Sequence, residues 1–476
     1  NNVAVGYLAL TANTTGTDNV AVGKEALNAN TTANNNTAIG VTALFSNTTG
    51  TANTSVGQSS LKTNTTGDSN TAVGRTALFA NTTGSDNSAF GYLALYTNTT
   101  ASHNTAVGVQ ALNTSNGSHN TGLGFKALRL NTTGQYNTAI GSVALDANTT
   151  ASNNTGVGYA ALNANTTGAG NTAVGQGSLQ TNTTGYQNTV VGKSAMHANT
   201  EGYNNVAVGF NSLLANTTGD MNIAIGYEAL AANTTADTNV GIGHKALTSN
   251  TTADRNTAIG YQALTTNTTG NNNISVGFNS LYANTTGEEN TAVGRSVLES
   301  NTTGSHNVAI GAYALDANTT AGKNSALGYQ ALVTNTTGDA NVALGYQALY
   351  ANTTGVQNTA VGDRALDANT TANYNVAVGA FTLGANTTGA NNTAIGSLAL
   401  SSNTTGASNI AVGPYCLDAN TTGGNNVAIG SSALSSNTTA NDNTALGNGA
   451  LESNTTGTSN TAVGRSEEHT SELQSP

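Results

Sequence analysis

The sequence predicts an all-β fold, a parallel β-solenoid (β-roll) of about 27 coils with a 17-residue repeat. Two observations support this prediction. Glycine recurs every 17 residues from Gly6 to Gly464, with a single 16-residue step between Gly108 and Gly124. Small and large apolar residues also keep fixed places relative to this glycine. A fixed period of this size is typical of a solenoid, in which each repeat stacks on its neighbours.

We number each repeat from the Asn that precedes this glycine by four residues, which gives N-[T/V]-A-[V/I/L]-G-x-x-A-L-x-[A/S/T]-N-T-T-[G/A]-x-x. Position 4 is large and apolar in all 28 copies, and position 9 is leucine in 26 of 27 copies, with Met196 as the exception. Positions 3 and 8 are mostly alanine. One repeat is too small to fold alone, whereas stacked repeats bury a continuous core. We expect this core to include Val22, Leu27, Ile39, Leu44, Val73 and Leu78.

Each coil is expected to contain two short strands. Val, Ile and Thr at positions 2 and 4 favour strand, and 17 residues interrupted by turns are too few for two helices of ordinary length. We therefore predict strands at positions 1–5 and 8–11, with turns at positions 6–7 and 12–17. Gly at position 5 occurs in every copy, which indicates a positive φ or no room for a Cβ atom. Position 15 is Ala in eight copies, so it is limited by space instead.

Asparagine occupies position 1 in all 28 copies and position 12 almost as regularly. Stacked strands place identical residues about 4.8 Å apart. At that spacing each Asn amide can hydrogen-bond to the next, so we predict two ladders of Asn side chains. The corner from Asn113 to Gly117 is one residue short, and Glu201 replaces the second Thr of another corner. Both departures indicate that the corner at positions 12–15 faces water.

The repeat defines the predicted domains. Residues 1–464 form a single solenoid domain, which we expect to be a fragment with both native ends missing. Residues 465–476 break the register and the composition together. This stretch resembles the translation of a common short-read sequencing adapter, so we expect a non-native tail.

Composition excludes several classes of protein. The chain has 12 Lys+Arg, 23 Asp+Glu and a formal net charge of −11, so a nucleic-acid partner is not expected. No apolar run approaches the roughly 20 residues that a membrane span requires, so membrane insertion of this stretch is not expected either. With a single cysteine the chain cannot be a disulfide scaffold.

No arrangement of residues indicates catalysis. The six histidines do not stand at metal-ligand spacing along the chain. Cys416 takes the place of the small residue at position 8 and is interpreted as a buried substitute for Ala. Gly-x-Gly pairs such as Gly122 and Gly124 belong to the repeat and precede no phosphate-binding motif. We therefore expect no enzyme activity, no catalytic residue, no cofactor and no metal site.

Two features are candidates for binding. Position 6 is aromatic in ten copies, and this aromatic stripe is interpreted as a sugar-recognition surface, a subunit contact or turn packing: Tyr7, Tyr92, Phe125, Tyr159, Phe210, Tyr227, Tyr261, Phe278, Tyr329 and Tyr346. The second feature is Asn-Thr-Thr, found in 25 corners, which matches the N-glycosylation acceptor pattern. Its regular Thr rows also raise ice binding as an alternative, although adjacent strand residues point to opposite faces.

The core motif resembles a known family. Asn19-Val20-Ala21-Val22-Gly23 is similar to the head repeats of trimeric autotransporter adhesins. The longer form, residues 328–332 followed by Asn335-Thr336-Thr337-Gly338, resembles repeats in phage tail-fibre and bacterial fibre proteins. The resemblance covers residues 2–464. It implies a left-handed parallel β-roll in which three chains associate, exposed outside the cell on a cell or virion surface.

These observations predict a structural extracellular fibre or adhesin rod that presents or spaces a receptor-binding surface. Its expected partners are further copies of the chain, as a homotrimer by resemblance, and a cell-surface glycan or protein receptor. The alternative is a monomeric solenoid that binds ice, carbohydrate or a mineral surface.

Overall fold

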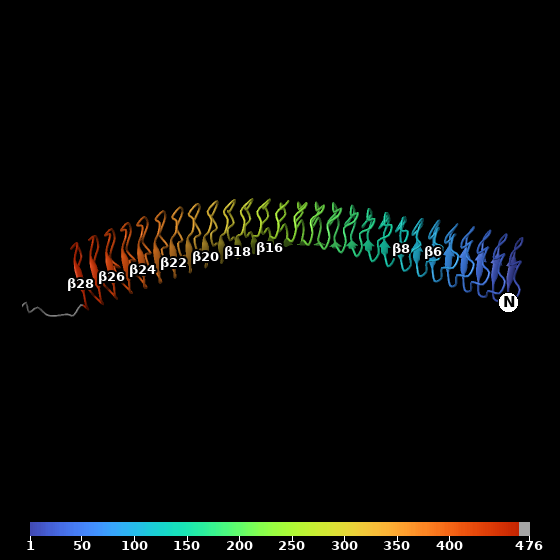
Figure 1. Cartoon of the computed structure of the whole chain (residues 1–476), viewed down its shortest axis with the longest axis horizontal. Coiled ribbons are helices and arrows are strands. Elements are labelled where there is room, and N and C mark those ends of the chain that lie inside the picture. The colour runs from blue at the N-terminus through green and yellow to red at the C-terminus, as the bar shows by residue number, and fades with distance from the viewer. Residues whose placement is uncertain (466–476) are drawn as a thin grey trace, which may run out of the picture. The chain divides into compact units, whose positions relative to one another are not determined.

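The structure is a computed structural model that describes residues 1–465, and residues 466–476 of the expected tail lie outside the described residues. The chain divides into two compact units, Asn1–Asn239 and Val240–Pro476. Each unit is built from three-residue strands joined by turns (Figure 1). No helix occurs in residues 1–465.

The strands of the first unit are β1 (Val3–Val5), β2 (Val20–Val22), β3 (Thr37–Ile39), β4 (Thr54–Val56), β5 (Thr71–Val73), β6 (Ser88–Phe90), β7 (Thr105–Val107), β8 (Thr121–Leu123), β9 (Thr138–Ile140), β10 (Thr155–Val157), β11 (Thr172–Val174), β12 (Thr189–Val191), β13 (Val206–Val208) and β14 (Ile223–Ile225). Those of the second unit are β15 (Val240–Ile242), β16 (Thr257–Ile259), β17 (Ile274–Val276), β18 (Thr291–Val293), β19 (Val308–Ile310), β20 (Ser325–Leu327), β21 (Val342–Leu344), β22 (Thr359–Val361), β23 (Val376–Val378), β24 (Thr393–Ile395), β25 (Ile410–Val412), β26 (Val427–Ile429), β27 (Thr444–Leu446) and β28 (Thr461–Val463).

Within each unit every strand pairs in parallel with the next one along the chain. Val20 pairs with Thr37, so identical repeat positions lie side by side. The short coil keeps this register, because Thr105 of β7 pairs with Thr121 of β8 across a 16-residue step. The predicted fold class, a parallel β-solenoid with a 17-residue coil, is therefore confirmed. Its handedness stays a prediction.

The strands are shorter and fewer than predicted. Only positions 2–4 are strand, and the second strand expected at positions 8–11 is wrong, because these residues form turns. The physical reason is a backbone with positive φ on both sides of position 8: Glu25 at position 7 has φ 57° and Leu27 at position 9 has φ 51°. The turn still bonds to the next coil, since the Leu27 N–H donates to the Ala43 carbonyl at 3.0 Å.

The core is narrower than expected. Leu27, Leu44 and Leu78 at position 9 are fully buried, as predicted, together with the alanines of positions 3 and 8. The prediction for position 4 is wrong: Val22 and Val73 are half-buried, and Ile39 is 41% exposed. Successive strand residues point to opposite faces, so when alanine at position 3 points inward, positions 2 and 4 must point outward.

The two glycine positions differ as predicted. Gly23 at position 5 has φ +137°, and a Cβ atom there would lie 2.5 Å from the Gly40 oxygen of the next coil. Gly16 at position 15 has no positive φ, and a Cβ atom there would crowd the carbonyl of Ala33 and the side chain of Asn13, which must shift in the eight coils that carry Ala at this position. Position 5 therefore needs glycine for its conformation, whereas position 15 is constrained by space alone.

The predicted Asn ladders are confirmed, and they also close each coil. Asn36 at position 1 and Asn47 at position 12 both donate from Nδ2 to the Gly50 carbonyl, at 2.9 and 2.8 Å. Asn47 Nδ2 also donates to Asn30 Oδ1 of the preceding coil at 3.1 Å. The Asn36 N–H donates to Asn19 Oδ1 at 3.0 Å. These Asn residues thus tie their own coil shut and link it to its neighbour.

Candidate functional site

The outward face of the strands carries an uncharged row of large apolar residues. We define this apolar row as the last residue of each strand: Val5, Val22, Ile39, Val56, Val73, Phe90, Val107, Leu123, Ile140, Val157, Val174, Val191, Val208 and Ile225 in the first unit, and Ile242, Ile259, Val276, Val293, Ile310, Leu327, Leu344, Val361, Val378, Ile395, Val412, Ile429, Leu446 and Val463 in the second. None of these residues is buried.

Exposure of the row is substantial within each unit. Leu123 is 44% exposed in the first unit, and Leu327 is 46% exposed in the second. The first residue of each strand points the same way and is Thr, Ser, Val or Ile in β1–β28. Each unit therefore has a strip of sheet without a charged side chain and without a covering layer in the single chain.

The predicted aromatic stripe lies on the surface. All ten position-6 rings are exposed, from 41% for Phe210 to 70% for Tyr7. Position 6 follows the glycine bend directly after the apolar row, so the stripe borders that row. Rings with this exposure are compatible with half-buried turn packing, with surface recognition and with a subunit contact, so all three interpretations stay predictions.

The structure brings six of the ten rings together in pairs. Phe210 stacks on Tyr227 with centroids 5.6 Å apart, Tyr261 on Phe278 at 5.2 Å, and Tyr329 on Tyr346 at 5.7 Å. Stacked rings turn their faces toward each other along the solenoid. Each stack covers one face of both of its rings, which reduces the ring surface that a sugar could use.

Single rings of the stripe are covered by cations instead. The Arg75 guanidinium lies 5.6 Å from the centroid of Tyr92, and Lys126 Nζ lies 4.9 Å from that of Phe125. Tyr7 and Tyr159 stack on no other ring among residues 1–465. The stripe is therefore a series of short stacks and cation–π pairs.

The Asn-Thr-Thr corner hides the nitrogen that N-glycosylation would modify. Asn64 is fully buried, and its Nδ2 atom donates to Asn47 Oδ1 at 2.8 Å and to the Gly67 carbonyl at 2.9 Å. A glycan on this nitrogen would disrupt both the ladder and the closure of the coil. In the folded solenoid this Asn therefore has a structural role and is not accessible for modification.

The two threonines of the corner differ in accessibility. Thr65 at position 13 donates from Oγ1 to the Thr82 carbonyl of the next coil at 3.0 Å. Thr66 at position 14 is exposed, and its hydroxyl has no hydrogen-bond partner among the described residues. Each coil therefore presents one threonine with a free hydroxyl, and the stacked corners form one such row, not two. A single row weakens the ice-binding alternative.

Register brings together histidines that the linear sequence kept apart. His103 and His119 stack with centroids 4.8 Å apart, and Tyr136 stacks on His119 at 4.9 Å. The reading by linear spacing missed this cluster, although comparing residues at equal repeat positions would have found it. Within residues 1–465 no group of three or more His, Cys, Asp or Glu side chains is arranged to hold a metal ion.

Two other titratable groups are shielded from water by the coils. Cys416 is fully buried, as predicted, and its Sγ lies 3.1 Å from the Ala428 carbonyl. Burial raises the pKa of its thiol to about 12, so the thiol stays protonated near neutral pH. Asp316 is half-buried at position 10, and burial, with added repulsion from Glu299, raises its pKa to about 6.

Sequence reasoning singled out the aromatic stripe but missed the apolar row as an exposed feature. Strict alternation about Ala38 would have revealed it, since Thr37 and Ile39 must then share the outer face. No helix in residues 1–465 is long and apolar enough to cross a membrane. No protein-family model matches this chain, and no curated protein matches it.

Proposed function

We propose that this chain is part of a structural extracellular rod that associates with further copies of itself through the apolar row. The observation that supports the proposal is the uncharged outer face of the strands, which repeats its large apolar residue in every coil. Parallel sheets are normally covered on both faces. A solvent-exposed aliphatic face of this extent is therefore a surface that a partner covers.

The area of this face suits a stable interface. Coils repeat about every 4.8 Å and a three-residue strand spans about 10 Å, so each coil contributes about 50 Å² of outward face. One unit with its 14 strands then provides about 700 Å². A standard interface buries about 800 Å² on each partner.

The occupant we propose is another copy of the same chain. Side chains in the row recur at the coil spacing, so a partner with the same spacing can pack a side chain against every one of them. A second copy has that spacing because it has the same repeat. Three copies are proposed from the resemblance to trimeric adhesin heads, and the aromatic stripe beside the row then contributes ring edges to the contact.

The test is the mass of residues 1–464 in solution, measured by size-exclusion chromatography with light scattering. We expect three times the mass of the chain. A second sample carries Ile140→Lys, Ile259→Lys, Ile310→Lys and Ile395→Lys, which are row residues between 37% and 42% exposed. These charges should reduce the mass to that of a monomer while the circular dichroism spectrum of the strands is retained.

A matched control carries four new charges elsewhere on the surface. Ser69→Glu, Asn153→Glu, Gln187→Glu and Ser408→Glu change exposed residues at position 17, where Glu289 occurs naturally. This control should keep the mass of the unmodified chain. A monomeric unmodified chain would overturn the proposal, and so would dissociation by both sets of charges alike.

A further inference from the structure

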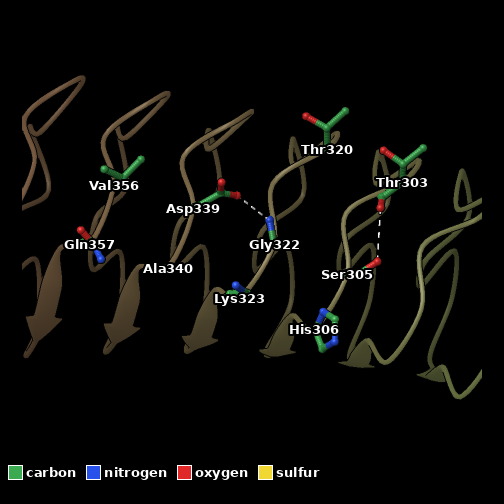
Figure 2. A pocket seen from close by; sticks show the side chains of 10 residues that line it. All are labelled: Thr303, Ser305, His306, Thr320, Gly322, Lys323, Asp339, Ala340, Val356 and Gln357. Atoms are coloured by element: carbon green, nitrogen blue, oxygen red, sulfur yellow. Dashed lines mark hydrogen bonds between the residues drawn. The ribbon is translucent and has the colours of Figure 1, made fainter.

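A second surface feature lies away from the strands, in the corners of the second unit. It is a cavity of about 470 Å³, lined by positions 14, 16 and 17 of consecutive coils (Figure 2). No lining residue belongs to a strand, so the cavity is separate from the apolar row. Its volume falls in the range of about 300–1,000 Å³ in which proteins hold small ligands.

The coil at the centre of the cavity has glycine, Gly322, at position 16. Its neighbours at the same position are Ser305 and Asp339, so the missing side chain leaves a notch between them (Figure 2). The Gly322 N–H donates to Asp339 Oδ1 at 2.7 Å, which fixes the carboxylate at one wall. The other oxygen, Asp339 Oδ2, accepts no hydrogen bond among residues 1–465.

The remaining walls supply unpaired hydrogen-bonding groups and a small apolar surface. Lys323 forms no ion pair among the described residues. The hydroxyls of Thr303 and Thr320, at the upper edge in Figure 2, are exposed and have no protein partner in residues 1–465. Val356 contributes an apolar side chain on the far side of Asp339 from Gly322.

We infer that this notch binds one or two rings of a neutral sugar. A carboxylate oxygen accepts from sugar hydroxyls, an ammonium and two threonine hydroxyls donate to them, and an apolar side chain packs against the C–H face of a ring. The charges of Asp339 and Lys323 cancel. His306, which also lines the cavity, has a carboxylate partner of its own, because Glu289 Oε2 lies 3.3 Å from His306 Nε2. The notch therefore favours an uncharged polyhydroxylated ligand. This inference does not depend on self-association. It proposes neutral sugars as the class of receptor that the rod recognises.

The first unit offers an internal comparison. A cavity of about 420 Å³ lies at the same repeat positions and is lined by Thr167, Gly170, Thr184 and Tyr186 among others. It contains no Lys and no Asp. Without a fixed carboxylate and a free ammonium it should bind the same sugar more weakly than the notch at Gly322 does.

The experiment uses residues 1–464 and a printed array of neutral oligosaccharides ending in galactose, glucose, mannose or N-acetylhexosamine. Sialylated oligosaccharides serve as the charged comparison. We expect binding to a subset of the neutral set. The best neutral oligosaccharide is then titrated against the variants by calorimetry.

Two variants alter the notch. Each introduces a residue that another coil of this chain already carries at the same repeat position, so both variants should fold. Thr320→Glu introduces a residue that Glu201 already places at position 14. Asp339→Asn keeps the acceptor for the Gly322 N–H, because Asn441 Oδ1 accepts from the Gly424 N–H in the same way at 2.6 Å. Each variant should weaken binding at least tenfold.

The controls make the same kinds of change outside the cavity. Thr405→Glu, and Asp68→Asn at a position-16 carboxylate whose Oδ1 accepts from the Thr51 N–H at 2.6 Å, should leave the affinity unchanged and keep the solution mass of the unmodified chain. Absence of binding to every neutral oligosaccharide at millimolar concentration would overturn the inference. Equal binding by the notch variants and the controls would overturn it too, as would a preference for the sialylated set.

Discussion

Asn98 and Ser115 occupy position 12 of consecutive coils, and the buried Oδ1 atom of Asn98 has no hydrogen-bond partner. One coil earlier the ladder is intact, because Asn98 Nδ2 donates to Asn81 Oδ1 at 2.9 Å. The Ser115 hydroxyl is too short to continue it toward Asn98, although it accepts from Asn131 Nδ2 at 3.1 Å. The one short coil thus interrupts the position-12 ladder at a single point in the first unit, between Asn98 and Ser115.

Replacing Ser115 with Asn should repair this interruption. Its Nδ2 group would donate to Asn98 Oδ1, and satisfying a buried acceptor contributes about 1–3 kcal/mol. Amide hydrogen exchange of peptides covering residues 98–131 should slow, as measured by mass spectrometry. The control Ser118→Asn, at a position where Asn34 occurs naturally, should leave exchange unchanged. Faster exchange in the Ser115 variant would refute the prediction.

The two glycine positions should respond differently to alanine. Gly57→Ala places a Cβ atom at φ +134° and 2.6 Å from the Gly74 oxygen, and should cost on the order of 3 kcal/mol or more. Gly50→Ala also crowds the Gly67 carbonyl of the next coil and Asn47 Oδ1, but it needs no positive φ and eight coils already hold Ala at this position, so it should cost only about 1 kcal/mol. Hydrogen exchange of residues 40–74 measures both. Comparable losses of protection would show that position 5 has no special conformational need.

Burying a charge in the core should disrupt the stack locally. Leu264 is fully buried, so Leu264→Asp places an unpaired carboxylate among apolar side chains. Loss of protection in the coils around residue 264 is expected by hydrogen exchange, with a lower thermal unfolding midpoint. Asp254→Asn should barely matter, because Asn retains an oxygen acceptor at this position. Equal effects of the two substitutions would be incompatible with Leu264 as a core residue.

Asp316 should make stability depend on pH. Its pKa in the folded chain, about 6, lies above the ordinary value of 3.8, first because of burial and then because of Glu299. The folded state therefore binds this proton more tightly than the unfolded state. The resulting stabilisation is complete below pH 3.8 and is lost as the pH rises through about 6.

Asp316→Asn removes the charged form and should raise the thermal midpoint at pH 7.5, with little change at pH 3.5. The matched control is Glu452→Gln, which changes an exposed carboxylate at the same repeat position. The control should shift the midpoint equally little at both values of pH. A pH-independent effect of Asp316→Asn would contradict the assignment.

The repeat allowed much of the fold to be predicted, because a period fixes which residues stack. The Asn ladders and the buried leucines such as Leu27 followed directly from it. The turn at positions 7–9 could not be predicted, since leucine rarely adopts a positive φ and only the packed coil imposes it. Ile39 was assigned to the core because its apolar character was weighed above strand alternation. The notch at Gly322 depends on the residues of adjacent coils, which the averaged repeat conceals.

In-register pairing also has an evolutionary consequence. Every internal coil of a unit meets its neighbours through the same bonds, as in the pairing of Val20 with Thr37. When one whole repeat is duplicated or lost in the gene, the coils on either side of the change therefore still pair through the same repeat positions. The stack can lengthen or shorten in steps of about 4.8 Å. Selection can thus change the length of such a protein by one coil at a time without changing the residues of its interior.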